Sequence, residues 1–249
     1  MDRNTITTLA ERPALSDVLW EMPDGRPEFM RHDLVANAYT GSIAEEFPEY
    51  VLVATDADGA LAARGLCVPF RMDHPKRGVL PDRGWDEVVV WAFADRRHGA
   101  VPDLVSAIEI AVRPDLGGLG LSGRMLGAMR ANARAHGFTE VVAPVRPSAE
   151  HHEPHASMPE YAFRVREEDG LPHDAWLRVH VRAGAVIEKV ASASMTISAT
   201  PAQWREWTGL PFDEAGDVVV PGALAAVRCD PERDNAVYVE PNVWVRHRL

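Results

Sequence analysis

Residues 112 to 122 of this chain read Val-Arg-Pro-Asp-Leu-Gly-Gly-Leu-Gly-Leu-Ser, and this stretch decides the expected fold. An apolar, partly β-branched run from Leu104 to Val112 leads into it and predicts a strand. Pro114 ends that strand, and apolar residues then recur at helical spacing as far as Gly137, which suits the end of a helix. A second strand is predicted from Thr139 to Val145. The stretch is therefore the loop of a strand–loop–helix–strand unit.

Three glycines give this loop a possible chemical use. Gly117, Gly118 and Gly120 carry no side chain, so the backbone can come close to a ligand. The loop opens a helix, whose first amide groups lack partners inside the helix and favour an anion such as a phosphate. A plain tight turn is the alternative interpretation, and the glycines alone do not decide between the two.

The residues around the loop resemble the acyl-CoA-binding motif of the GNAT acyltransferase superfamily. The similar positions are the run from Val112 to Ser122, followed by Met125-Leu126 and Gly137-Phe138. Two positions depart from the family pattern, because Gly117 stands where Gln or Arg is usual and Ser122 where Gly or Ala is usual. The first departure removes a side chain and keeps the amides. The resemblance implies these acyl-CoA-binding residues: Ile110, Ala111, Val112, Gly117, Gly118, Leu119, Gly120, Leu121 and Ser122.

The resemblance also implies the fold. It predicts a single domain over residues 1 to 249, of mixed α/β class, with flanking helices and a mostly antiparallel twisted sheet. The sheet is expected to splay near Val112 and Val142 to form the acyl-CoA cleft, and backbone amides of the first strand would stabilise an oxyanion there. Asp58-Gly59 predicts a turn between two apolar runs, which gives an early hairpin. The segment from Trp85 to Asp95 has helical length, but its valines leave a strand possible.

A second informative stretch runs from His173 to Gly184. Asp174 is a good N-cap, apolar residues follow at helical spacing, and Gly184 suits the position after a helix. In the GNAT family this resembles the last helix, where many members carry a tyrosine general acid four residues before the glycine. His180 stands at that position, so the resemblance implies that His180 is the general acid or base. A packed polar residue is the alternative.

Ser148 and His180 together resemble one branch of the superfamily, the GNAT-like loading domains of polyketide synthases. Those domains carry Thr and His at the matching positions and are described as decarboxylating malonyl-CoA before loading a carrier protein. Ser148 replaces the Thr here. Ser148 is therefore a second candidate catalytic residue.

The C-terminal part predicts further strands from Asp217 to Val227 and from Ala236 to Val245. The latter is expected to be the closing edge strand, because Pro241 fits an edge or a bulge better than a central position.

Composition limits the class of partner. The formal net charge of -11 argues against nucleic acid, which needs a basic face. No apolar run approaches about 18 residues, so neither a membrane span nor a signal region is expected and the protein should be cytoplasmic.

Cys67 and Cys229 lack metal spacing and are expected to be buried thiols. The histidines from His151 to His155 suggest a metal, but Pro154 makes a substrate-facing loop the preferred interpretation, and no metal is expected.

These observations leave three functional hypotheses, all with acyl-CoA, either acetyl-CoA or malonyl-CoA, as the bound group. The preferred one is an acyltransferase enzyme that passes an acyl group from acyl-CoA, or from a carrier thioester, to an amine or thiol. The acceptor is a small molecule or an acyl carrier protein. The others are a decarboxylase that loads a carrier protein, and a binding module without turnover. The oligomeric state stays open.

Overall fold

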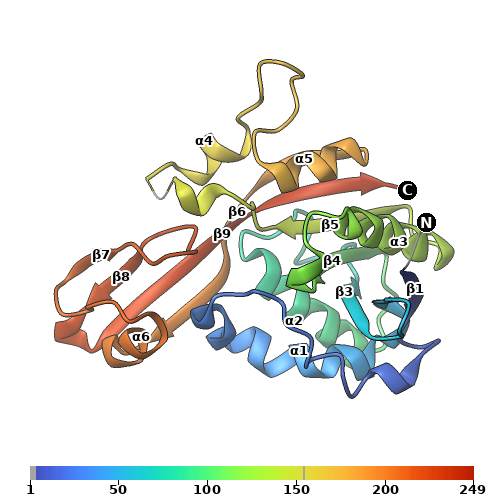
Figure 1. The fold of residues 1–249 in the computed structure, drawn as a ribbon, viewed down its shortest axis with the longest axis horizontal. Helices are drawn as coiled ribbons and strands as arrows, with labels where there is room; N and C mark the ends of the chain where they lie inside the picture. The colour runs from blue at the N-terminus through green and yellow to red at the C-terminus, as the bar shows by residue number, and fades with distance from the viewer. Residues whose placement is uncertain (1–3, 154) are drawn as a thin grey trace.

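The computed structural model describes residues 4–153 and 155–249 (Figure 1). In this part of the chain nine strands form one sheet in the order β1-β2-β3-β4-β5-β9-β8-β7, and β6 pairs with β9 outside that path. Figure 1 shows α1 and α2 together on one side of the sheet, α3 on the other, and α5 over β6 and β9. The expected mixed α/β fold, mostly antiparallel, is confirmed. The strands are β1 (Thr5–Thr8), β2 (Val51–Thr55), β3 (Leu61–Phe70), β4 (Leu104–Val112), β5 (Glu140–Val145), β6 (Ala185–Ala199), β7 (Gly216–Val218), β8 (Val227–Asp230) and β9 (Asn235–Arg248). The α-helices are α1 (Leu34–Glu46), α2 (Gly84–Arg97), α3 (Leu121–Ala135), α4 (Met158–Ala162), α5 (Ala175–Arg182) and α6 (Pro201–Thr208).

The early hairpin is confirmed as β2 and β3. Its turn is closed by the carboxylate of Asp56, whose Oδ1 accepts from the amides of Asp58 at 3.1 Å and Ala60 at 3.0 Å. Gly59 takes a φ of 82°, which a residue with a side chain adopts only with strain. The Asp-Gly signal in the sequence therefore reflects a real backbone requirement.

The strand–loop–helix–strand unit is also confirmed, as β4, α3 and β5. β4 and β5 run parallel and pair at only two positions, Val105 with Val141 and Ser106 with Val142. Beyond these pairs the strands separate. The splay therefore begins at Val142 as expected, but on β4 it begins after Ser106 and not near Val112.

A bulge in β4 lies directly after this point. The register of β3 against β4 shifts between Leu66 and Cys67, which leaves Ile108 as the extra residue of β4. The indole Nε1 of Trp85 donates to the carbonyl of Ile108 at 2.9 Å and fixes the bulge. Trp85 lies on α2, so the segment whose valines left a strand possible is a helix.

The helix that carries His180 is α5, and its start and end match the sequence signals. The carboxylate of Asp174 caps it, because Oδ1 accepts from the amides of Trp176 at 2.9 Å and Leu177 at 3.0 Å. Gly184 has a φ of 88° and turns the chain directly into β6.

The position predicted for the last strand is wrong. β9 is not an edge strand: it pairs with β5, β6 and β8. Pro241 is tolerated there because the register of β6 shifts between Ala191 and Met195, opposite Asn242 and Glu240. The proline, which lacks an amide hydrogen, therefore sits at a bulge. The sequence interpretation named a bulge as one of two possibilities, and the bulge is the correct one.

The strand predicted from Asp217 to Val227 is mostly wrong. β7 covers only its first residues, and β8 begins at its last residue. The chain between them turns through Gly222, whose φ is 83°. Gly222 cannot continue an extended strand in that conformation.

The two cysteines are buried free thiols, as expected. Cys67 and Cys229 are each 1% exposed. Burial raises the pKa of both thiols, so neither is a reactive thiolate. Among the described residues, no helix is both long enough and apolar enough to span a membrane.

Candidate active site

A cavity of about 260 Å³ opens where β4 and β5 separate. It reaches from the bulge of β4 across to α5 and to the loop before α1. Its wall combines apolar side chains with charged ones. The residues lining it are Ala107 to Ala111 of β4, Ala143 to Arg146 at the end of β5, Leu126, Trp85, Trp176, His180, Met195, Met30, Asp24, Arg26, Glu240 and Asn242.

β4 gives the cavity a backbone wall. Ile110 and Ala111, two of the three residues implied for this strand, line the cavity, whereas Val112 pairs with Ala63 and does not. Because β5 has left β4, backbone groups of β4 that would have paired with β5 are free to bond a ligand. This is the kind of edge on which an extended chain such as pantetheine can lie.

The glycine loop lies beside the cavity, at the start of α3, and not in its wall. Residues 117 to 120 are exposed, while the side chain of Leu121 is buried and Ser122 is half-buried. Gly118 and Gly120 have φ angles of 75° and 77°, so the loop needs glycine at both positions. The amide of Gly117 donates to the carbonyl of Pro114 at 3.2 Å, but within the described residues amides 118 to 123 donate no backbone hydrogen bond. These amides are free to hold an anion.

His180 lies on α5 at the cavity wall, with only 2% of its surface exposed. Its Nδ1 is 2.9 Å from Nε2 of His247, a residue of β9. Its other nitrogen, Nε2, is buried and has no hydrogen-bond partner within the described residues. Trp176 packs edge-on against the ring, with 4.7 Å between ring centroids. One nitrogen is thus held by protein, and the other is left for a ligand.

The surroundings keep His180 uncharged. Burial, together with the nearby His247 and Arg130, lowers the pKa of His180 to about 3. The ring is therefore neutral throughout the physiological pH range. A neutral imidazole can accept or donate one hydrogen bond at Nε2, but it does not carry the extra proton of an imidazolium acid.

Ser148 does not meet His180 at the cavity. Ser148 is exposed and is not part of the cavity wall. Its hydroxyl donates to Oδ2 of Asp174 at 3.1 Å and its amide to the same oxygen at 2.8 Å. Tyr161 also donates to this oxygen, at 3.1 Å. Ser148 therefore contacts the residue that caps the helix of His180, and its catalytic role stays a prediction.

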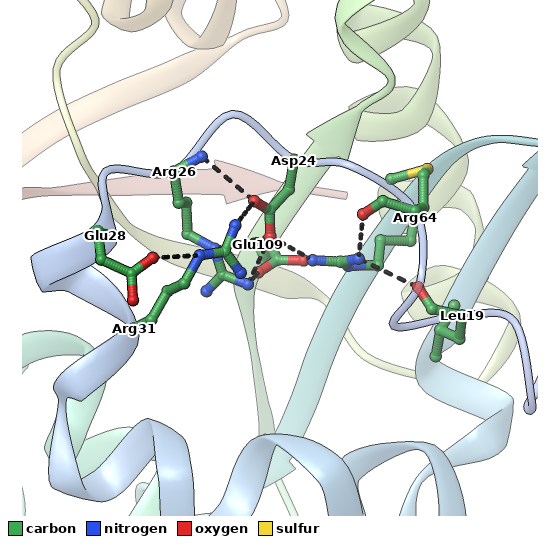
Figure 2. A network of polar contacts seen from close by, with 8 residues as sticks. Leu19, Asp24, Arg26, Glu28, Arg31, Arg64 and Glu109 are labelled. Atoms are coloured by element: carbon green, nitrogen blue, oxygen red, sulfur yellow. Dashed lines mark hydrogen bonds and ion pairs between the residues drawn. The ribbon is translucent and has the colours of Figure 1, made fainter.

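The sequence interpretation missed a network of charged groups at the other end of the cavity (Figure 2). Its centre is Arg64 of β3, whose side chain is 1% exposed. Arg64 Nε donates to Oε1 of Glu109 at 2.6 Å, and Nη2 donates to Oδ2 of Asp24 at 2.9 Å. Its Nη1 donates to the carbonyl of Leu19 at 3.1 Å. Arg64 thus ties the loop before α1 to β4. The only signal in the sequence was an arginine and a glutamate inside otherwise apolar strands.

The two carboxylates of this network differ in how fully they are paired. Asp24 accepts from Arg26, Arg31 and Arg64. Burial raises its pKa, but the hydrogen bonds and charge of Arg26 and the charge of Arg31 bring it well below the usual value. Glu109 Oε1 accepts from Arg64, whereas Oε2 lies 3.4 Å from Nη2 of Arg26 and accepts no hydrogen bond within the described residues. Glu109 Oε2 is therefore the oxygen that retains capacity for a ligand.

Glu240 is the third carboxylate of the wall, and it is fully paired. Its Oε2 accepts from Arg146 Nε at 3.0 Å and from the hydroxyl of Tyr238 at 2.8 Å. Its Oε1 accepts from Asn242 at 3.1 Å. Glu240 therefore orders this side of the cavity and offers little to a ligand.

The histidines of the loop after β5 show no metal arrangement. The rings of His151 and His152 lie 3.9 Å apart, centroid to centroid. Across residues 4–153 and 155–249, no three His, Cys, Asp or Glu side chains are placed to hold a metal ion. Pro154, on which the sequence argument depended, lies outside the described residues. A substrate-facing role for this loop stays a prediction.

Comparison with known proteins gives one full-length sequence relative and several structures of the same fold. No family model matches the chain. An arginine N-acetyltransferase from Aspergillus versicolor is 29% identical over 98% of this chain and 94% of its own length. The loading GNATL domain of CurA from Lyngbya majuscula matches 99% of this chain and 98% of its own, with a TM-score of 0.58 and 17% identity. The GphF GNAT-like decarboxylase, solved with isobutyryl-CoA, matches the same shares with a TM-score of 0.57 and 17% identity.

Proposed function

We propose that the chain is a GNAT-type acyltransferase, which its fold and its full-length match support, and that it transfers an acyl group from acyl-CoA to the amine of a small cationic acceptor. One observation carries this proposal. A single cavity is lined by the free backbone edge of β4, by His180, whose Nε2 has no hydrogen-bond partner within the described residues, and by the incompletely paired Glu109. These groups match the donor, the proton transfer and the acceptor of one reaction.

The donor side is the glycine loop and β4. The free amides of residues 118 to 123 and the positive end of the α3 dipole suit the pyrophosphate of CoA. The pantetheine chain would then run along Ile110 and Ala111 toward the bulge at Ile108. Backbone amides of β4 near the bulge would stabilise the negative charge on the thioester oxygen.

The acceptor side is the charged network of Figure 2. Glu109 Oε2 lies 3.4 Å from Nη2 of Arg26 and accepts no hydrogen bond within the described part of the chain, so it can pair with an ammonium or guanidinium group of the acceptor. The arginine N-acetyltransferase that resembles this chain acts, by its name, on a molecule of that kind. We therefore place arginine and other guanidino or polyamine compounds first among acceptors, ahead of a thiol or a carrier protein.

The reaction follows from these positions. The acceptor nitrogen attacks the thioester carbon, a C–N bond forms, and the nitrogen loses a proton to Nε2 of His180. The C–S bond then breaks, CoA leaves as the thiolate, and the proton from His180 neutralises it. A neutral ring is the form that accepts a proton. The low pKa of His180 disfavours the imidazolium in the free protein, and the negative charge of the oxyanion offsets that cost in the transition state.

The test is direct. Purified protein is mixed with acetyl-CoA and, in turn, arginine, agmatine, spermidine and the uncharged-side-chain control norvaline, and both the free thiol and the acylated product are measured. We expect acylation of the cationic compounds, and a fall in kcat of about 10² to 10⁴-fold in His180→Ala. His98→Ala is the matched control, since His98 is an exposed histidine of the same chain.

Each alternative has its own result. Binding of acetyl-CoA without turnover of any acceptor would favour a binding module. Malonyl-CoA converted to acetyl-CoA without an amine would favour the decarboxylase hypothesis. Full activity in His180→Ala would show that His180 is not the proton acceptor.

A further inference from the structure

The pairing of His180 with His247 is unusual, because two buried neutral imidazoles share one hydrogen bond. His247 is fully buried on β9, where it pairs with Val141 of β5 and Ala185 of β6. The sheet therefore fixes its backbone on both sides. The 2.9 Å contact between His180 Nδ1 and His247 Nε2 joins a cavity residue to this fixed point, across 67 residues of sequence.

We propose that His247 is a positioning residue that holds His180 in the tautomer with the hydrogen on Nδ1 and the lone pair on Nε2, at the acyl-transfer cavity. The inference rests on the proposed function, in which Nε2 of His180 accepts the proton of the acceptor amine.

The two nitrogens of the contact share a single hydrogen, which allows only two arrangements. When His180 Nδ1 carries it, His180 Nε2 has a lone pair and accepts protons. When His247 Nε2 carries it, His180 must place its own hydrogen on Nε2, which then only donates. The tautomer of His247 thus decides whether Nε2 of His180 accepts or donates a proton at the cavity.

The neighbour of His247 selects the first arrangement. Burial and Arg130 lower the pKa of His247, the backbone carbonyl of Ala183 acts in the opposite direction as an acceptor for the ring, and the net pKa is about 4. Nε2 of His247 faces His180, so Nδ1 is the nitrogen left for that carbonyl, although no well-formed hydrogen bond joins them. A carbonyl can only accept, so it favours the hydrogen on Nδ1 of His247. Nε2 is then a pure acceptor for His180.

The charges around His180 and His247 favour the neutral form of both rings. Arg130 of α3 is the charged group that acts on both rings. Within the described residues, no carboxylate forms a hydrogen bond with either imidazole. An imidazolium at either position would face Arg130 in a buried site. A second neutral histidine orients His180 without adding charge, which a carboxylate in its place would do.

A spectroscopic test reads the tautomer without any turnover. Protein labelled with 15N in its ten histidines is studied by two-bond proton–nitrogen correlations of the rings, with His180→Gln and His247→Gln to assign the signals. We expect His180 to show a protonated Nδ1 and an unprotonated Nε2 at pH 7. A protonated Nε2, or a mixture of the two tautomers, would overturn the proposal.

A kinetic test uses two substitutions at the same position. The side-chain oxygen of His247→Gln can still accept from His180 Nδ1, whereas His247→Phe cannot. We expect His247→Phe to lower kcat about 10 to 100-fold with an unchanged KM for acetyl-CoA, the range typical of partners that orient a functional imidazole. We expect His247→Gln to retain most of kcat. Equal losses in both variants, or a loss confined to KM, would contradict the positioning role.

The two proposals fail in different ways. In a His180→Ala background, His247→Phe should cause no further loss of kcat. If His180→Ala is fully active while the spectra show the expected tautomer, the base assignment fails and the orienting contact stands. If acylation depends on His180 but the spectra show hydrogen on Nε2, the positioning inference fails and the acyl transfer stands.

Discussion

Replacing Arg64 with methionine should destabilise the protein more than any exposed ion-pair change. Arg64 is almost fully buried and donates to Glu109, Asp24 and the carbonyl of Leu19. Methionine fills part of the volume but donates nothing. Glu109 then lies in the cavity wall without its closest cation, and Asp24 keeps only Arg26 and Arg31.

The magnitude follows from which groups are left unpaired. Breaking a buried ion pair by removing one partner costs about 3 to 5 kcal/mol, because the other charge stays buried. In a chain of this size a change of 1 kcal/mol shifts Tm by about 2 to 4 °C, so Arg64→Met should lower Tm by roughly 6 to 20 °C. The double variant Arg64→Met, Glu109→Met removes both charges and should recover part of this loss.

Thermal unfolding followed by circular dichroism measures these differences. Arg233→Met is the control, since Arg233 pairs with Asp230 at 3.0 Å but its side chain is 85% exposed, and such pairs contribute about 0 to 1 kcal/mol. The reasoning is refuted if Arg64→Met melts with the control, or if the double variant is no more stable than Arg64→Met alone.

Four other substitutions test three separate features. Burial raises the pKa of Asp86 from 3.8 to about 8, so the contribution of its neutral form to stability is full below pH 3.8 and is lost as the pH rises to 8. Denaturant unfolding should show that the free energy of unfolding falls by up to about 4 kcal/mol between pH 5 and 8, and Asp86→Asn should abolish this fall. Asp174→Ala removes the cap of α5 and should lower the free energy of unfolding by about 1 to 2 kcal/mol and reduce kcat. Ser148→Ala keeps the cap and should lower the free energy of unfolding by about 1 kcal/mol or less. Thermal melts and initial rates measure both variants. Gly120→Ala places a side chain at a φ of 77°, which should destabilise the loop by about 1 to 2 kcal/mol, and calorimetry should show weaker acetyl-CoA binding. An unchanged affinity would show that the loop is not part of the acyl-CoA site.

The features that were predictable from the sequence are the local ones. The glycine loop, the hairpin turn at Gly59 and the cap at Asp174 each depend on residues within a few positions of one another. Their signals are backbone conformations that few residues adopt and hydrogen bonds to neighbouring amides. Residues that are close together in the sequence therefore determine each of these features by themselves.

The features that were missed depend on strand register. Arg64, Glu109 and Asp24 come from β3, β4 and a loop, and no spacing in the sequence relates them. His247 reaches His180 only because β9 lies inside the sheet, where the sequence interpretation had placed an edge strand. A single proline suggested that edge, and the matching bulge in β6 was not visible from the sequence.

The place of β9 in the chain has a consequence for biosynthesis. β9 follows every other strand in the sequence, yet it pairs with β5, β6 and β8 and spans the molecule in Figure 1. A ribosome therefore delivers last the strand that joins the two halves of the sheet. Until β9 emerges, β5 and β8 each present an open edge to other nascent chains. This protein should depend on chaperones that shield exposed strands during synthesis, and a ribosome that stalls before β9 should leave an aggregation-prone chain.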